Sequence, residues 1–77
     1  MIKLTTPYTK GEKVTQVQRV LAAAYFCPDK NTENHGVDGI YGPKTANAVK
    51  RFQIMNSLQA DRIYGPKTKD KLAAVLS

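Results

Sequence analysis

The sequence predicts an all-α domain, a small three-helix bundle that contains an internal turn-plus-helix repeat. The first observation is the repeat itself: residues 40–45 (IYGPKT) recur unchanged at 63–68, with Asp38 and Asp61 two residues before each copy. A six-residue word that recurs in so short a chain indicates one structural device used twice. The second observation is that three segments carry apolar residues at helical spacing, whereas no segment is convincing as a strand.

Length and composition limit what the chain can be. Its 77 residues predict one domain over 1–77, with a packed core over about 9–76. A core of this size supplies only about 3–5 kcal/mol of net stability, so the helices must fit well. Cys27 is the only cysteine, which excludes an internal disulfide, and with His35 it leaves too few ligands for a structural zinc site. We expect no metal and no cofactor, and no apolar run is long enough to span a membrane.

The first helix is expected to begin near Lys10. Thr9 and Glu12 have the spacing of a capping box. The helix should end at position 25 or 26, because Pro28 disfavours helical geometry in the residue before it. A polar surface loop then extends from Cys27 to residue 39. The apolar stripe of this helix consists of Val14, Val17, Leu21 and Ala24, with Gln18 beside it.

Each copy of the repeat predicts a turn, a short extended apolar link and a helix start. The Gly-Pro dipeptide favours a helix start, because proline at the first helical position loses no needed N–H. The second helix should therefore run from Pro43 to about Met55, and Asn56 could take the left-handed position after it. The third should run from Pro66 to about Leu76. The predicted apolar faces are Thr45, Ala48, Val49, Phe52 and Met55 in the second helix, and Thr68, Leu72, Val75 and Leu76 in the third.

The net charge of +6 is concentrated in the second half of the chain. Residues 1–42 hold five basic and four acidic side chains, whereas residues 43–77 hold seven basic and two acidic ones. A basic half attracts polyanions such as nucleic acid, anionic lipid surfaces or the anionic polymers of a bacterial wall. Solubility alone is an equally good explanation of this charge.

Catalytic groups are scarce. His35 is alone in a polar loop, and Cys27 has no partner histidine at a recognisable spacing, so we expect no catalytic residue. Asp38 and Asp61 stand at equivalent turn positions, where each most simply caps its own turn through a bond from backbone to side chain.

The ordered motifs resemble those of the peptidoglycan-binding domain, a module of bacterial and phage cell-wall hydrolases. The resemblance spans about residues 11–72. It departs from the family pattern at Arg62 and Ser57, where glycine is common, and in a long loop at 27–36. The matching residues are Gly11, Val14, Val17, Gln18 and Leu21; Asp38 to Gly42 with Thr45; Ala48 to Gln53; and Asp61, Gly65, Thr68 and Leu72.

The resemblance implies a non-catalytic module that binds wall peptidoglycan and holds an attached hydrolase of the endolysin, autolysin or amidase type near its substrate. Its partners would be glycan and stem peptide, with anionic wall polymers as a further possibility, and the module would be monomeric and act at the cell wall. Residues 1–7 lack the apolar stretch of a secretory signal, so the domain belongs to a longer protein or reaches the wall by another route, as a phage endolysin made in the host cytoplasm does.

The predicted binding site is a groove formed by the two turns, with Gln53 between them. Tyrosine rings would face sugars, aspartates would accept hydrogen bonds, and cations would meet stem-peptide carboxylates. The expected site residues are Asp38, Tyr41, Gln53, Asp61, Arg62, Tyr64 and Lys67. The alternative is structural: both tyrosines would plug the bundle with their hydroxyls at the rim, and Gln18 and Gln53 would tie loops to helices.

Three other functions are alternatives to wall binding. A DNA-binding helix-turn-helix needs a turn of three to four residues, and the link over 57–65 is too long. An enzyme complete in 77 residues would need a convergent set of reactive groups, which the sequence does not supply. An inhibitory metalloprotease prodomain would use a cysteine to block zinc, but Cys27 lacks the flanking arginine and glycine of that switch.

Overall fold

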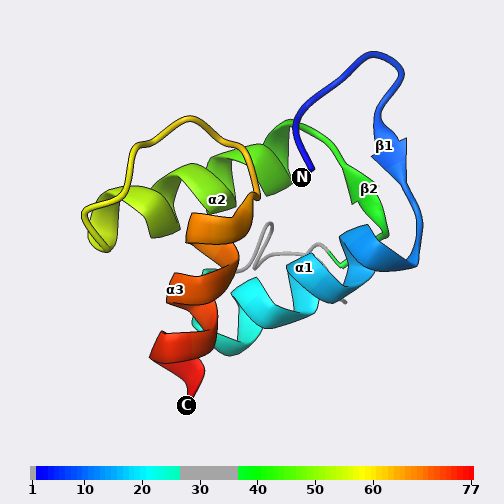
Figure 1. Ribbon diagram of the computed structural model, residues 1–77. Helices are drawn as coiled ribbons and strands as arrows, with labels where there is room; N and C mark the ends of the chain where they lie inside the picture. The colour runs from blue at the N-terminus through cyan, green and yellow to red at the C-terminus, as the bar shows by residue number, and fades with distance from the viewer. Residues whose placement is uncertain (1, 27–36) are drawn as a thin grey trace.

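The computed structural model describes residues 2–26 and 37–77 and confirms the helical bundle (Figure 1). In Figure 1, α2 lies above α1, and α3 runs from the level of α2 down to the far end of α1. The predicted bounds of the second and third helices are confirmed. In chain order the elements are β1 (Thr9–Lys10), α1 (Glu12–Ala23), β2 (Ile40–Tyr41), α2 (Pro43–Met55) and α3 (Pro66–Leu76).

The first helix begins later than predicted, and the capping box is wrong. Thr9 belongs to β1, which pairs antiparallel with β2 so that Thr9 faces Tyr41 and Lys10 faces Ile40. The N-cap residue is Gly11, whose φ of 132° suits glycine. The extended apolar link of the first repeat therefore pairs with the residues that precede α1, and this tertiary contact overrides the local capping signal.

Both α1 and α2 end in a Schellman motif without glycine. After α1, Tyr25 is left-handed (φ 67°) and the Phe26 N–H donates to the Leu21 carbonyl. After α2, Ser57 is left-handed (φ 59°) and the Leu58 N–H donates to the Gln53 carbonyl. Ser57, rather than the predicted Asn56, takes the left-handed position. The predicted polar loop falls mostly on residues 27–36, outside the described residues, as do Cys27 and His35.

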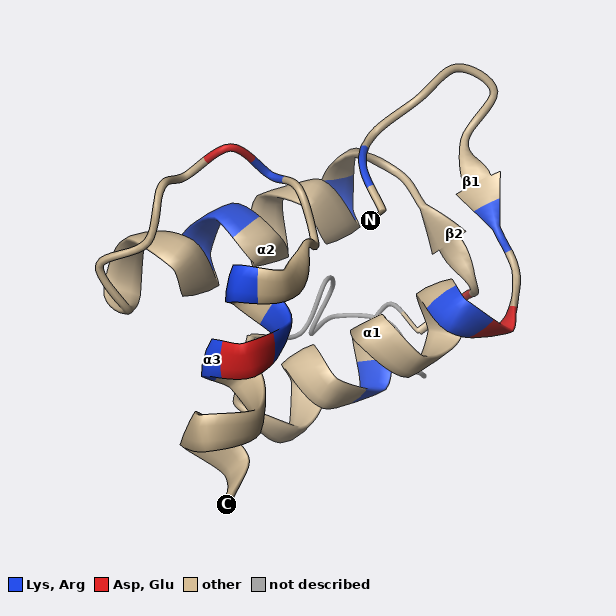
Figure 2. Cartoon of the chain, viewed as in Figure 1, with Lys and Arg blue, Asp and Glu red and all other residues tan. Residues whose placement is uncertain are grey.

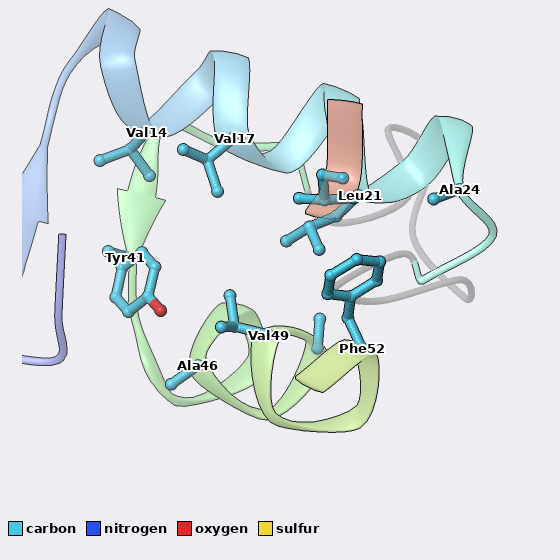
Figure 3. Packing of buried hydrophobic residues seen from close by; sticks show 10 residues of the cluster. Val14, Val17, Leu21, Ala24, Tyr41, Ala46, Val49 and Phe52 are labelled. Carbon is cyan, nitrogen blue, oxygen red and sulfur yellow. The ribbon is translucent and has the colours of Figure 1, made fainter. Parts of the chain in front are cut away.

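The core lies between α1 and α2, whose apolar side chains point toward one another (Figure 3). The predicted stripe of α1 is confirmed. Of the helix positions predicted to be buried, Met55, Val75 and Leu76 are wrong, with 73%, 46% and 43% of their surface exposed. Leu72 is the only apolar residue that α3 buries fully among the described residues, and the last turn of α3 extends beyond α1 (Figure 1). The buried apolar residues are Val14, Val17, Leu21, Ala24, Tyr41, Ala46, Ala48, Val49, Phe52 and Leu72.

The N-terminal residues are part of the packed unit. Ile2 packs against the core, and its N–H and carbonyl exchange hydrogen bonds of 3.0 and 2.8 Å with the backbone of Tyr64. The fold therefore extends beyond the expected start of the core near residue 9. No helix among the described residues is long and apolar enough to cross a membrane.

Candidate functional site

A buried glutamine clasps the first copy of the repeat (residues 38–45). Gln18 of α1 has no exposed surface. Its Nε2 lies 2.9 Å from Asp38 Oδ1, 3.1 Å from the Ile40 carbonyl and 2.9 Å from Thr45 Oγ1. Its Oε1 accepts the N–H groups of Asp38 and Gly39 at 3.1 and 2.9 Å. One amide therefore joins the turn, the extended link and the start of α2.

A second glutamine repeats this arrangement at the second copy (residues 61–68). Gln53 of α2 is 1% exposed, and its Nε2 lies 2.9 Å from Asp61 Oδ1, 3.1 Å from the Ile63 carbonyl and 3.1 Å from Thr68 Oγ1. Its Oε1 accepts the Arg62 N–H at 3.0 Å. The contacts of both glutamines therefore match the alternative in which they tie loops to helices. Each clasp comes from the helix that precedes its turn.

Both aspartates cap their own turns, as predicted. Asp38 Oδ1 accepts the Ile40 N–H, and Asp61 Oδ1 accepts the Ile63 N–H, each at 2.9 Å. The Ile63 N–H and the Gln53 amide lower the pKa of the Asp61 carboxyl below its ordinary value. Each carboxylate therefore has one oxygen committed to its turn, while the side chain as a whole remains exposed.

The two turns share a backbone shape but have different residues at the left-handed position. Gly39 has φ 74° and Arg62 has φ 62°, so both turns use the left-handed region. A Cβ at Gly39 would lie 2.9 Å from Thr15 Oγ1, so a side chain there would have to displace the Thr15 hydroxyl. Arg62 is exposed, and its side chain has room. The second turn therefore keeps a positive φ without glycine, and Arg62 adopts a strained conformation that glycine would adopt freely.

The two repeat tyrosines have different surroundings. Tyr41 has no exposed surface, and its hydroxyl donates a 2.7 Å hydrogen bond to the Arg62 carbonyl. Burial and the nearby Asp61 carboxylate raise the pKa of Tyr41 far above its ordinary value. The prediction that Tyr41 offers a ring face to a sugar is wrong in this fold, since its ring is enclosed. Tyr64 is only half-buried, and burial raises its pKa as well.

A pocket of about 440 Å³ lies beside the second clasp. We call it the second-copy pocket. It brings together three of the predicted site residues, Gln53, Asp61 and Lys67. Arg62 is exposed on the adjoining turn, whereas Tyr64 lines a different groove, and Asp38 belongs to the first clasp. The predicted site residues therefore do not line a single groove across both turns. The accessible pocket lies at the second copy.

Positive charge is spread over the molecule. Figure 2 shows basic residues along α2, on the link before α3 and on α3, and also on the N-terminal segment, at β1 and on α1. Within residues 2–26 and 37–77, no group of three or more metal-ligating side chains comes together. The buried polar side chains belong to the two clasps. Recognition of a ligand would therefore depend on the exposed hollows and the exposed charged side chains.

These features define a small helical binding module, in which two clasped turns hold three helices and leave a basic, grooved surface exposed. The chain belongs to the peptidoglycan binding domain family, whose family model matches residues 10–72. Both clasps and both turns lie within the matched residues.

Three curated proteins similar to the chain are N-acetylmuramoyl-L-alanine amidases. The chain is 68% identical to N-acetylmuramoyl-L-alanine amidase XlyA of Bacillus subtilis (strain 168) over 77 residues, which cover 100% of the chain and 26% of that protein. It is 63% identical to the amidase CwlH of the same organism over 76 residues, 99% of the chain and 30% of that protein. It is 60% identical to a probable N-acetylmuramoyl-L-alanine amidase of Bacillus licheniformis over 74 residues, 96% of the chain and 21% of that protein.

The chain thus spans between 21% and 30% of the length of these three relatives. The matched family is a binding domain, so this segment corresponds to a binding module and not to a catalytic one. No solved structure gives a significant match to the chain.

Proposed function

We propose that this domain binds bacterial peptidoglycan without cleaving it and holds an attached cell-wall hydrolase of the amidase class at its substrate. The observation that carries the proposal is the family match over residues 10–72, which includes both clasped turns. The amidase relatives support the identity of the attached enzyme, because each is several times longer than this chain. The domain would act at the cell wall as a monomer.

We propose that the second-copy pocket is one of the binding surfaces. Peptidoglycan offers sugar hydroxyls, amides and stem-peptide carboxylates. Lys67 lines the pocket and Arg62 is exposed beside it, so both can meet carboxylates, and the uncommitted oxygen of Asp61 can accept from hydroxyl or amide groups. Anionic wall polymers would be attracted by the same cations.

Arg62 is the most informative residue of this surface. Its strained φ of 62° persists although glycine would adopt it freely, and strained residues concentrate at functional sites. The backbone of Arg62 is held at both ends, by the Gln53 side chain and by the Tyr41 hydroxyl. The guanidinium therefore projects from a fixed base, which suits it to forked recognition of a carboxylate or phosphate.

Co-sedimentation with insoluble wall sacculi tests the function. The chain should pellet with purified sacculi at low salt, part of the binding should weaken as salt screens the cations, and the turbidity of the suspension should not fall. A chain that stays in the supernatant at low salt would refute wall binding, and clearing of the suspension would reveal catalysis.

Two variants test the pocket. Lys67→Glu should weaken sedimentation, whereas Lys71→Glu makes the same charge change at an exposed α3 position outside the pocket and serves as the matched control. Arg62→Gly should raise the melting temperature, because it relieves the left-handed strain, and should also weaken binding. If binding is unchanged while stability rises, Arg62 does not belong to the site.

A further inference from the structure

A second concave surface lies between α1 and the start of α3, apart from the second-copy pocket. We call it the α1–α3 groove. Its volume is about 670 Å³, within the range of about 300–1,000 Å³ that small-molecule sites occupy. Gly65 and Pro66 border both hollows, but the clasp residues Gln53 and Asp61 line only the second-copy pocket. The residues that line the groove include Ile2, Lys13, Val17, Val20, Tyr64 and Lys69.

The groove presents the one repeat tyrosine that is not enclosed. Its counterpart Tyr41 has its hydroxyl bonded to Arg62. Within the part of the chain that the structure describes, the Tyr64 hydroxyl has no hydrogen-bond partner and is not a buried, unsatisfied group. The backbone of Tyr64 is bridged to Ile2, and its side chain is half-buried against the core. An aromatic ring held in this way with a free hydroxyl is suited to a ligand that is part apolar and part polar.

The groove has an apolar part and a charged rim. Val17 and Val20 of α1, three residues apart, lie on one face of the helix, and Ile2 lies beside Tyr64. Lys13 comes from α1 and Lys69 from α3, so the two ammonium groups approach the groove from opposite walls.

Both lysines are exposed, and no ion pair of either is found within residues 2–26 and 37–77. Asp70 also lies at the groove, where its carboxylate can accept hydrogen bonds from hydroxyl groups. The rim therefore has a net positive charge and is complementary to an anionic ligand.

We propose that the α1–α3 groove binds an acetamido sugar that carries a carboxylate, with the acetamide and sugar ring on the apolar part and Tyr64, and the carboxylate between Lys13 and Lys69. This inference rests on the proposed function, because peptidoglycan is the polymer that would supply such a sugar. The acetamide methyl packs on Val17, Val20 and Ile2, and the free Tyr64 hydroxyl bonds a sugar hydroxyl.

Two sources of the carboxylate are compatible with this chemistry. One is the lactyl carboxylate of muramic acid, which is free where the amide bond to the stem peptide has been cut. The other is a carboxylate of the stem peptide itself. N-Acetylmuramic acid carries the first, and N-acetylmuramoyl-L-alanine carries the second, while N-acetylglucosamine has the same ring and acetamide with no carboxylate. The three compounds therefore separate the two sources and the contribution of the charge.

The test is an NMR titration of the chain with each of the three sugars. The backbone amides of Tyr64 and Lys69 should shift with N-acetylmuramic acid or N-acetylmuramoyl-L-alanine, and the stronger of the two identifies the source. N-Acetylglucosamine should bind about 2- to 25-fold more weakly, since it loses two exposed charge contacts that contribute up to about fivefold each. Equal binding of all three sugars, or shifts confined to the second-copy pocket, would overturn the proposal.

A double variant that reverses the charge of both lysines provides a second test. Lys13→Glu with Lys69→Glu should weaken binding of the carboxylated sugars at least about fivefold, and Lys71→Glu should leave it unchanged. Retained binding of the carboxylated sugars by the double variant would overturn the groove assignment. Wall binding itself would still stand if the wild-type chain sediments with sacculi. Loss of wild-type sedimentation would instead overturn the function itself. Near-identical amide spectra of the variants away from the substitutions establish that they are folded.

Discussion

Replacing Gln53 with leucine should remove most of the stability of the domain. Leucine retains a similar volume but has no polar atoms, so the whole second clasp is lost. The Arg62 N–H, the Ile63 carbonyl and the Thr68 hydroxyl then lose their amide partner. The change deletes only one side of each hydrogen bond, which is the costly case.

The magnitude follows from which groups water can reach. Asp61 is exposed and regains solvent, so its loss costs little. Thr68 is 3% exposed, so water cannot replace the amide partner of its hydroxyl. A buried group left without its partner costs about 1–3 kcal/mol, so two such groups in the lower half of that range amount to about 2–4 kcal/mol. This is most of the roughly 3–5 kcal/mol expected for so small a domain. Because 1 kcal/mol shifts the melting temperature by about 4–8 °C at this size, the midpoint should fall by about 10–30 °C.

Thermal unfolding followed by circular dichroism measures the effect. Gln16→Leu is the matched control, because Gln16 is exposed on α1 and its replacement should change stability by less than about 0.5 kcal/mol. Gln18→Leu should be at least as damaging as Gln53→Leu, since Gln18 accepts two backbone N–H groups and Gln53 accepts one. If Gln53→Leu melts within a few degrees of the control, the clasp does not hold the second turn and the reasoning fails.

Three further predictions concern the turns and Tyr41. Gly39→Ala should cost about 1–3 kcal/mol in urea denaturation, because φ is 74° and the new Cβ would lie 2.9 Å from Thr15 Oγ1; an unchanged midpoint would contradict this. The raised pKa of Tyr41 gives stability that is fully present below the ordinary value of 10.0 and is lost as pH rises above it, because the unfolded chain releases its proton first. Tyr41→Phe should therefore show a smaller alkaline loss of stability than wild type, although it is less stable at neutral pH without the bond to Arg62. The lowered pKa of Asp61 gives stability that is present above the ordinary value of 3.8 and is lost as pH falls through the folded-state value, so Asp61→Asn should lessen the acid sensitivity seen in melts over pH 2–5.

The helix starts at Pro43 and Pro66 could be predicted because their signal is local. A Gly-Pro dipeptide ahead of a periodic segment needs no distant partner to begin a helix. The prediction of the first helix start was wrong for the opposite reason. Thr9 and Glu12 have good local capping chemistry, but Thr9 pairs with Tyr41, far along the chain, and this pairing sets the boundary.

The site could be predicted only in part, and the two tyrosines show why. They stand in identical hexapeptides, so nothing local distinguishes them. The difference lies in distant partners: the Arg62 carbonyl accepts a hydrogen bond from the hydroxyl of Tyr41, whereas Tyr64 is bridged through its backbone to Ile2. The α1–α3 groove was missed because it combines α1, α3 and the N-terminal residues, which no motif connects. Lys13 and Lys69 appear in the sequence only as two of many cations.

The bridge between Ile2 and Tyr64 also bears on the order in which the domain folds. The Gln53 clasp closes a loop between residues 8 apart in sequence, and the Gln18 clasp reaches Asp38, 20 residues away. The bridge joins nearly opposite ends of the chain, so its loop-closure entropy is the largest of the three and its contact should form last. In native-state hydrogen exchange, the amides of Ile2 and Tyr64 should then open before those of the helices. Because Ile2 and Tyr64 also line the α1–α3 groove, we expect this groove to form after both clasps and to open before them.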